Sequence, residues 1–193
     1  LYPLMATTLR FFFLFTLTLI LAHFSTTYGV FSEHSNIMLP TNQQNTEKTT
    51  HLHFFYHENL EGENPTVIKI IDPSTQSPNG FGTSFMMDNI LTEEQDITSK
   101  AVGRAQGLFG LASLEDRGLV MLINLVFIEG GFAGSTLSLL GRNPVQDTVR
   151  EMPIVAGSGV FRFARGYAVV KSLYEISTSE NFVVEYNVTV SHP

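Results

Sequence analysis

The sequence predicts an all-β protein, namely an eight-stranded antiparallel up-and-down β-barrel. Beyond residue 50, apolar residues recur with a period of two, as they do in half-buried strands, and helical periodicity is nearly absent. The apolar runs are short, and Gly, Pro, Asn or Ser bounds each of them. Many of the fifteen glycines fall inside these runs, where glycine allows the strands of a barrel to bend.

Eight segments carry the strand pattern. The last segment alternates most clearly, with Val184, Tyr186 and Val188 on one face. Segment 119–128 also fits a buried helix, but its β-branched residues and flanking glycines favour a strand. The expected strands are 50–58, 66–72, 81–89, 102–112, 119–128, 135–140, 158–172 and 182–191. An eight-stranded barrel holds either packed side chains or one small ligand, and the sequence leaves both interiors open.

Three regions are expected along the chain. Residues 1–29 resemble a secretory signal peptide, with residues 1–4 as upstream translated sequence and an apolar run, 11–22, that is too short to span a membrane. Residues 30–49 are polar and aperiodic, so we expect a flexible arm. Residues 50–193 would form the barrel. We therefore expect a soluble protein secreted to the extracellular space, which in a plant is the apoplast.

Composition excludes several functional classes. The chain has no cysteine, so disulfides, thiolate catalysis and iron–sulfur clusters are impossible. The net charge of −7 argues against nucleic acid or an anionic membrane surface as a partner. His51, His53 and His57 are spaced along one strand, but a flat strand spreads ligands too widely for a metal ion, and we expect no metal site.

Glu58 is the most informative titratable residue. By strand parity it shares a face with Phe54 and Tyr56, so it either points into the barrel or ends the strand in solvent. A carboxyl inside an apolar cavity holds its proton more strongly and can act as a general acid. Asn187 begins an N-glycosylation sequon, Asn-Val-Thr, on the face predicted to be outward.

Several motifs resemble the dirigent family of plant proteins, in the same order and over essentially the whole predicted domain. These are HFFYHE (53–58), NPT (64–66), SKAVGRAQG (99–107), GSTL (134–137), GRN (141–143), VREMP (149–153), FRFARGYA (161–168) and VEYNV (184–188). The resemblance implies a calycin-type antiparallel barrel, as in allene oxide cyclases, that is secreted and forms a homo-oligomer, a dimer or a trimer.

The resemblance also implies a function. Dirigent proteins steer the stereoselective coupling of phenoxy radicals, as when two coniferyl alcohol radicals give an optically active lignan. A separate laccase or peroxidase supplies the oxidation, so no cofactor is expected. Some legume relatives instead dehydrate isoflavanols through a quinone methide and close a pterocarpan ring. Carried onto this chain, the family site implies Glu58 and Arg150 as catalytic residues. The expected substrate-binding residues are Phe54, Tyr56, Phe109, Asn143 and Phe163.

This chain departs from the lignan-forming pattern at three of these positions. Glu58 stands where aspartate is usual, Phe109 replaces a tyrosine, and Asn143 replaces a second aspartate, whereas Arg150 is kept. Three hypotheses follow: stereoselective radical coupling, a pterocarpan-synthase-like lyase, or a non-catalytic phenolic-binding protein of plant defence or the cell wall.

Overall fold

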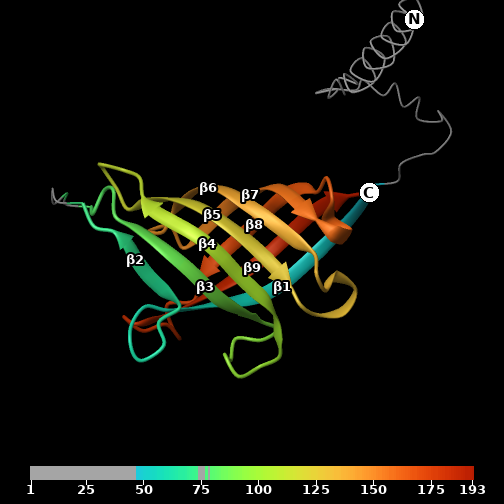
Figure 1. Cartoon of the computed structure of the whole chain (residues 1–193), viewed down its shortest axis with the longest axis horizontal. Helices are drawn as coiled ribbons and strands as arrows, with labels where there is room; N and C mark the ends of the chain where they lie inside the picture. Colours follow the sequence, from blue (N-terminus) through green and yellow to red (C-terminus); the bar gives the residue numbers. More distant parts are fainter. Residues whose placement is uncertain (1–46, 74–76, 78) are drawn as a thin grey trace, which may run out of the picture. The chain divides into compact units, whose positions relative to one another are not determined.

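The computed structural model describes residues 47–73, 77 and 79–193, and these fold into nine antiparallel strands and two short 3-10 turns (Figure 1). The predicted signal peptide, and the expected arm up to residue 46, lie outside the described residues. The elements are β1 (Lys48–Asn59), β2 (Val67–Ile71), β3 (Ser84–Thr92), β4 (Ala101–Leu111), β5 (Gly118–Phe127), η1 (Gly130–Phe132), β6 (Thr136–Pro144), β7 (Val149–Ser158), η2 (Gly159–Phe161), β8 (Arg165–Ser172) and β9 (Asn181–His192). No helix among these residues has the length and apolar character needed to cross a membrane.

Eight of the strands close into a barrel, so the predicted fold class is confirmed. From β3 to β9 each strand pairs with the next along the chain, and β9 pairs with β1. The ring closes where Phe55 and His57 of β1 lie opposite Thr92 and Ile90 of β3. The remaining strand, β2, pairs only with β3 and lies outside the closed ring.

The predicted segments differ from the strands of the ring at two places. One predicted strand lies outside the ring and one strand of the ring was not predicted, so the number of ring strands is still eight. Segment 66–72 corresponds to β2, which is not part of the ring. Segment 158–172 combines η2 with β8, while β7 was missed. Pro153 lies in the middle of β7, and proline weakens the sequence pattern of a strand because it cannot donate to a ladder. The structure accommodates Pro153 beside a register shift between β6 and β7, at the pair Leu139 and Ile154.

The predicted strand 135–140 ends too early, because β6 continues through the GRNP sequence at 141–144. Within β6, Asn143 lies directly opposite Leu119 of β5. Asn143 is therefore a buried strand residue. Its side chain lies on the inner face of the barrel, where it meets Arg150 of β7.

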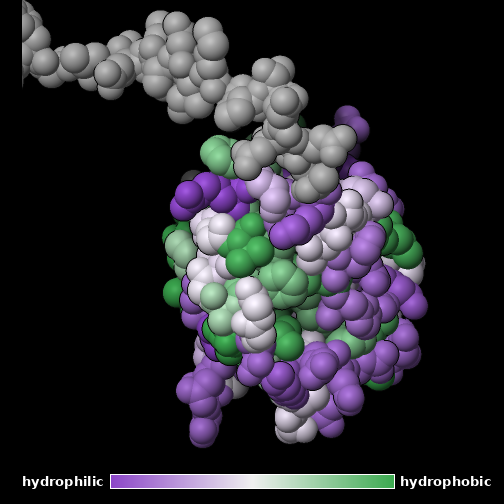
Figure 2. Space-filling view, turned by 90° about the vertical axis from the view of Figure 1, so that its right-hand side faces the viewer, coloured by the Kyte–Doolittle hydropathy of each residue, from purple (hydrophilic) through white to green (hydrophobic). Residues whose placement is uncertain are grey.

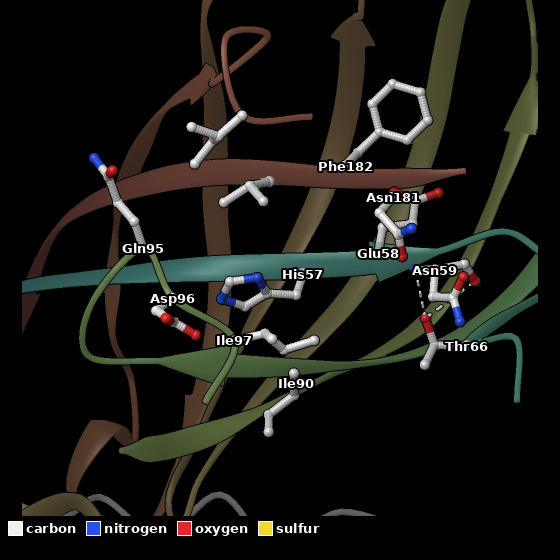
Figure 3. Close-up of a pocket in the computed structure, with 12 residues that line it drawn as sticks. His57, Glu58, Asn59, Thr66, Ile90, Gln95, Asp96, Ile97, Asn181 and Phe182 are labelled. Carbon is white, nitrogen blue, oxygen red and sulfur yellow. Dashed lines mark hydrogen bonds between the residues drawn. The ribbon is translucent and has the colours of Figure 1, made fainter. Parts of the chain in front are cut away.

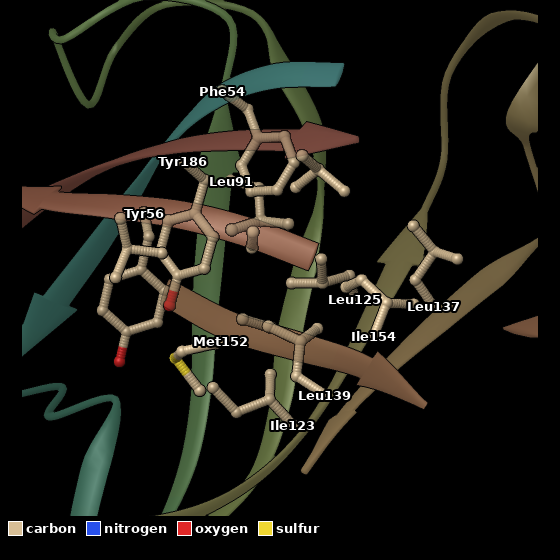
Figure 4. Close-up of a cluster of buried hydrophobic side chains, with 14 of the residues drawn as sticks. Phe54, Tyr56, Leu91, Ile123, Leu125, Leu137, Leu139, Met152, Ile154 and Tyr186 are labelled. Carbon is tan, nitrogen blue, oxygen red and sulfur yellow. The ribbon is translucent and has the colours of Figure 1, made fainter. Parts of the chain in front are cut away.

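One half of the barrel interior is filled by side chains. Aromatic rings pack at the end near η1 and η2: Phe54 stacks on Tyr186 at 5.4 Å, and Phe161 contacts Phe127 at 5.7 Å and Phe132 at 5.1 Å between ring centroids. An aliphatic layer lies beside these rings (Figure 4), formed by Leu91, Ile123, Leu125, Leu137, Leu139, Met152 and Ile154. This half of the interior is therefore packed with side chains, which is one of the two interiors that the sequence left open.

Glycine permits close contact between neighbouring strands at two positions. A Cβ atom at Gly107 would lie 2.0 Å from the Leu122 carbonyl oxygen, and one at Gly166 would lie 2.0 Å from the Thr189 carbonyl oxygen. Both contacts are with backbone, which cannot move aside without breaking the ladder. The glycines inside β4 and β8 thus allow the tight curvature of the ring.

The end of the barrel that carries the β5–β6 and β7–β8 connections faces the viewer in Figure 2. Hydrophobic and hydrophilic residues alternate in small groups on this surface. Ile128, Val160 and Phe163, all from these two connections, are exposed apolar residues. Phe163 has a φ angle of 62°, in the left-handed region that a bulky residue rarely adopts.

Candidate functional site

The half of the barrel away from η1 and η2 contains a cavity of about 480 Å³. This volume lies within the range of about 300–1,000 Å³ that is typical of small-molecule sites. The walls come from strand ends around the ring and from the connections between them. The residues that border the cavity are Tyr56, Glu58, Leu60, Phe85, Phe109, Leu111, Arg117, Leu119, Met121, Asn143, Val145, Gln146, Arg150, Ser172, Tyr174, Phe182, Val184 and Tyr186.

One wall of the cavity carries an acid. Strand parity points Glu58 inward with Tyr56, and the Tyr56 hydroxyl donates to Glu58 Oε2 at 3.0 Å. Asn89 Nδ2 of β3 donates to the same hydroxyl oxygen at 2.6 Å. Burial raises the pKa of the Glu58 carboxyl above its ordinary value, and the hydrogen bond from Tyr56 opposes that rise. Glu58 therefore holds its proton to higher pH than an exposed glutamate.

Another wall carries a buried guanidinium. Arg150 Nε donates to Asn143 Oδ1 at 2.8 Å, and Arg150 Nη1 donates to Ser172 Oγ at 2.9 Å and to the Asp147 carbonyl oxygen at 3.0 Å. Burial lowers the pKa of Arg150 from its ordinary value. The group stays charged at neutral pH, because arginine begins from a pKa above 12. These bonds fix the plane of the cation against the wall.

Tyr186 of β9 links the two walls electrostatically. Burial raises the pKa of its hydroxyl, the charge of Arg150 lowers it, and the charge of Glu58 raises it. Figure 4 shows the hydroxyls of Tyr56 and Tyr186 both directed away from the aliphatic layer. A ligand in this cavity therefore meets an acid, a cation and a neutral phenol that does not ionise at neutral pH.

The sequence and fold were compared with known proteins. A model of the dirigent-like protein family matches residues 49–191. Dirigent protein 21 of Arabidopsis thaliana is 45% identical over 178 residues, which cover 91% of this chain and 93% of the relative. Pterocarpan synthase 1 of Glycine max is 44% identical over 149 residues, which cover 76% of this chain and 80% of the relative. The solved structure of the pterocarpan synthase dirigent protein GePTS1 is similar, with a TM-score of 0.70 and 42% identity, covering 76% of this chain and 86% of that one.

The chain belongs to the dirigent family. In this dirigent barrel, five of the site residues expected from the sequence border one cavity: Tyr56, Glu58, Phe109, Asn143 and Arg150. They come from β1, β4, β6 and β7, so closure of the ring brings them together. Phe109 stacks on Phe85 at 4.9 Å between ring centroids and forms an apolar wall.

Two expected substrate-binding residues, Phe54 and Phe163, do not border this cavity. Phe54 points inward but lies in the filled half, stacked on Tyr186, and does not border the cavity. Phe163 is 78% exposed and points away from the interior. A continuous strand over 158–172 would place Phe161 and Phe163 on one face, but η2 ends at Phe161 and interrupts the alternation, so Phe161 is buried while Phe163 is not.

Several site residues were missed from the sequence. Arg117, Met121, Ser172 and Tyr174 border the cavity, and Asn89 lies behind Tyr56. Parity along β3 could have found Asn89, because it shares a strand face with the inward residues Met87 and Leu91. Arg117 and Tyr174 lie in connections, where no strand pattern indicates direction.

A second cavity, of about 430 Å³, lies on the outer side of β1, where His57 faces the β3–β4 connection (Figure 3). His57 Nε2 bonds Thr92 Oγ1 at 2.6 Å, and burial lowers the pKa of the imidazole. The other two histidines considered as metal ligands have separate partners: His51 bonds Thr189, and His53 bonds Glu185. Within the part of the chain that the structure describes, no three metal-ligating side chains converge.

Asn187, the predicted glycosylation site, is exposed on β9, opposite His53 of β1 and Val169 of β8. Its side chain lies on the outer face of the barrel, away from the cavity. Glycosylation there stays a prediction.

Proposed function

We propose that this dirigent protein binds a planar phenol in the barrel cavity and dehydrates it through a quinone methide, as a pterocarpan-synthase-like lyase. The placement of Glu58 and Arg150 on one cavity is the observation that supports this most strongly. A carboxyl that keeps its proton suits a leaving hydroxyl, and a fixed guanidinium suits a phenolate oxygen. The similarity to pterocarpan synthases over three quarters of the chain points the same way.

The proposed step needs no oxidant. Protonated Glu58 gives its proton to the benzylic hydroxyl of the substrate, the C–O bond breaks, and water leaves. The phenol on the same ring gives its proton to water, and its electrons move into the ring to form the quinone methide. A second phenolic hydroxyl of the substrate then attacks the benzylic carbon, and the ionised Glu58 takes its proton. The first phenol regains a proton, so the net change is the loss of one water.

Arg150 and Tyr186 would stabilise the negative charge that develops on the phenol oxygen. The guanidinium is already oriented by Asn143 and Ser172, so no reorganisation is needed as the charge forms. The hydroxyl that Phe109 lacks, relative to lignan-forming members, would be supplied by Tyr186 from the other side of the cavity. The stacked rings of Phe85 and Phe109 offer a flat face for the aromatic ring of the substrate.

The direct test is turnover of an isoflavanol without any oxidant, followed by chiral chromatography. Replacing Glu58 by Gln keeps the shape but removes the acid, and general acid catalysis is worth about 10²–10⁴-fold, so turnover should fall by at least about a hundredfold. Glu61→Gln, at an exposed turn position beyond the same strand, is the matched control and should turn over normally. Unchanged turnover in Glu58→Gln would remove Glu58 from the mechanism.

The second candidate is stereoselective coupling of phenoxy radicals, in which the cavity only orients the reactants. The apolar wall of Phe85 and Phe109 favours it, because orientation alone supplies selectivity. Coniferyl alcohol and a laccase, with and without the protein, form the test. An optically active lignan would support coupling, and racemic product across several monolignols would contradict it. Ligand binding with no change of product in either assay would indicate a non-catalytic phenolic-binding protein.

We also propose that the protein is secreted and assembles with copies of itself. Leu108, Leu122 and Leu140 are exposed on the outer face of β4, β5 and β6, and strand register places them side by side. A contiguous apolar strip on a sheet surface is suited to an interface. Leu122→Asp should shift the protein to a monomer in sedimentation experiments. An unchanged mass would exclude this strip from the interface.

A further inference from the structure

The hydrogen bonds behind Glu58 form one chain that runs in a single direction. The backbone N–H of Asn59 donates to Thr66 Oγ1 at 2.9 Å. The Thr66 hydroxyl donates to Asn89 Oδ1, and Asn89 Nδ2 donates to the Tyr56 hydroxyl oxygen at 2.6 Å. The Tyr56 hydroxyl completes the chain by donating to Glu58 Oε2 at 3.0 Å.

The first link sets the direction in which the others run. A backbone N–H only donates, so the Thr66 oxygen accepts from Asn59. The Thr66 proton has two acceptors in reach, and Asn89 Oδ1 is much nearer than the Asn59 carbonyl oxygen at 3.4 Å. The Asn89 amide then presents its oxygen to Thr66 and its nitrogen to Tyr56. The Tyr56 oxygen accepts from that nitrogen, and its proton is left for Glu58.

The threonine at the start of the chain is held in place by its own backbone. The Thr66 N–H donates to the Asn59 carbonyl oxygen, and its carbonyl accepts from the Asp88 N–H, both at 2.9 Å. Thr66 is thus held between β1 and β3. Its hydroxyl reaches the inner polar group of Asn89 from outside the barrel ring, because Thr66 directly precedes β2.

Asn89 is 0% and Tyr56 3% exposed, so water does not compete for the bond between them. A reversed amide would place its nitrogen against the Thr66 hydroxyl and its oxygen against Tyr56. The Thr66 proton would then keep only the longer contact with the Asn59 carbonyl oxygen at 3.4 Å, and the buried amide would lose an acceptor contact, which is costly. The polarity of the chain is therefore a stable property of the folded protein.

We propose that Thr66 and Asn89 are positioning residues that direct the Tyr56 hydroxyl proton onto Glu58 and so tune how readily Glu58 releases its own proton. The role as an acid rests on the function proposed above, whereas the hydrogen-bond control of Glu58 does not. Neither Thr66 nor Asn89 needs to touch the ligand.

Four other charged or titratable side chains border this cavity, namely Arg117, Arg150, Tyr174 and Tyr186. None of them donates a hydrogen bond to Glu58 within the described residues, so Tyr56 is the donor through which the chain acts. Removing its donation takes away the contact that opposes burial, and the pKa of Glu58 should rise.

The test measures the pKa of the Glu58 carboxyl by carbon NMR in the full-length, ligand-free protein, with Glu58→Gln to assign the signal. In Thr66→Val the Asn89 amide loses its partner and is free to turn its oxygen toward Tyr56. The Tyr56 hydroxyl then donates to Asn89, so the pKa of Glu58 should rise as it does in Tyr56→Phe. In the double variant Thr66→Val/Tyr56→Phe, the threonine change should add no further shift.

Three further variants separate this role from a loss of packing. Asn89→Leu leaves no amide oxygen to compete with Glu58 for the Tyr56 proton, so the pKa of Glu58 should rise less than it does in Thr66→Val. Thr66→Ser keeps the hydroxyl and should keep the wild-type value, and it serves if Thr66→Val does not fold. Thr92→Val removes a buried threonine hydroxyl on β3 that bonds His57, outside this hydrogen-bond chain, and should leave the pKa of Glu58 unchanged.

Turnover supplies a second and separate readout. A general acid works while protonated, so a higher pKa of Glu58 should move the alkaline limb of the pH profile of isoflavanol turnover to higher pH. If the pKa shifts as expected but no variant or wild type turns over an isoflavanol, the positioning role stands and the proposed lyase function fails. An unchanged Glu58 pKa in Thr66→Val, or an equal rise in Asn89→Leu, would overturn the inference, whatever the turnover.

Discussion

Glu58→Gln should make the protein more stable at alkaline pH and no more stable at acid pH. The folded-state pKa of Glu58 lies above the unfolded value of 4.5, because burial disfavours the ionised form more than the Tyr56 hydrogen bond favours it. The native state therefore binds more protons than the unfolded state between these two pKa values. Linkage makes stability fall with rising pH in that window, by at most about 1.4 kcal/mol per pH unit for one group.

Urea unfolding of wild type and Glu58→Gln from pH 4 to pH 9 measures this directly. The difference between their free energies of unfolding cancels the other titrating groups, such as Asp96 and Asp116, whose pKa values are lowered in the folded state. The difference should be flat below pH 4.5, grow in favour of the variant above it, and level off above the folded-state pKa. A difference that is constant across the range would refute the assignment of a raised pKa to Glu58.

Two further substitutions test the role of Arg150 in the cavity wall and the role of Gly166 in the curvature of the barrel. Arg150→Lys keeps the charge but loses the guanidinium hydrogen bond to Asn143. One lost charge-assisted hydrogen bond costs about 1.5–3 kcal/mol, so phenol binding measured by calorimetry should weaken about ten- to a hundredfold. Arg142→Lys, at an exposed position, should leave phenol binding unchanged. Gly166→Ala would place a Cβ 2.0 Å from a backbone oxygen and should cost about 1–3 kcal/mol of stability, while Gly131→Ala, with nothing within 4 Å, should be neutral in thermal unfolding. Equal effects of either variant and its control would contradict the corresponding argument.

Strand parity, the alternation of inward and outward side chains, predicted much of the fold and part of the site from the sequence alone. It placed Tyr56 and Tyr186 on the inner face and gave Glu58 two possible directions, of which the structure shows the inward one. Parity works because each strand of a closed barrel has one inner and one outer face. It fails wherever the backbone leaves the extended conformation, as η2 shows for Phe163.

Other features depend on contacts between segments that are far apart in sequence. Whether β2 joins the ring depends on which strand pairs with the edge of β3 that β4 leaves free. There, β1 takes the closing position at Phe55–His57, and β2 is left beside the other part of β3. The bond between Asn89 and Thr66 follows from that same arrangement, so no local pattern reveals it.

The cavity persists because its polar residues bond to the wall and not to each other across the space. Arg150 is satisfied by Asn143 and Ser172 beside it, and Glu58 by Tyr56 two residues away on the same strand. An apolar residue at these positions would gain by collapsing inward, as the rings do in the filled half. A polar residue that is already satisfied along the wall gains nothing by collapse, since it would leave its partner unsatisfied. The residues proposed to act on the ligand are thus also the ones that keep the space open for it.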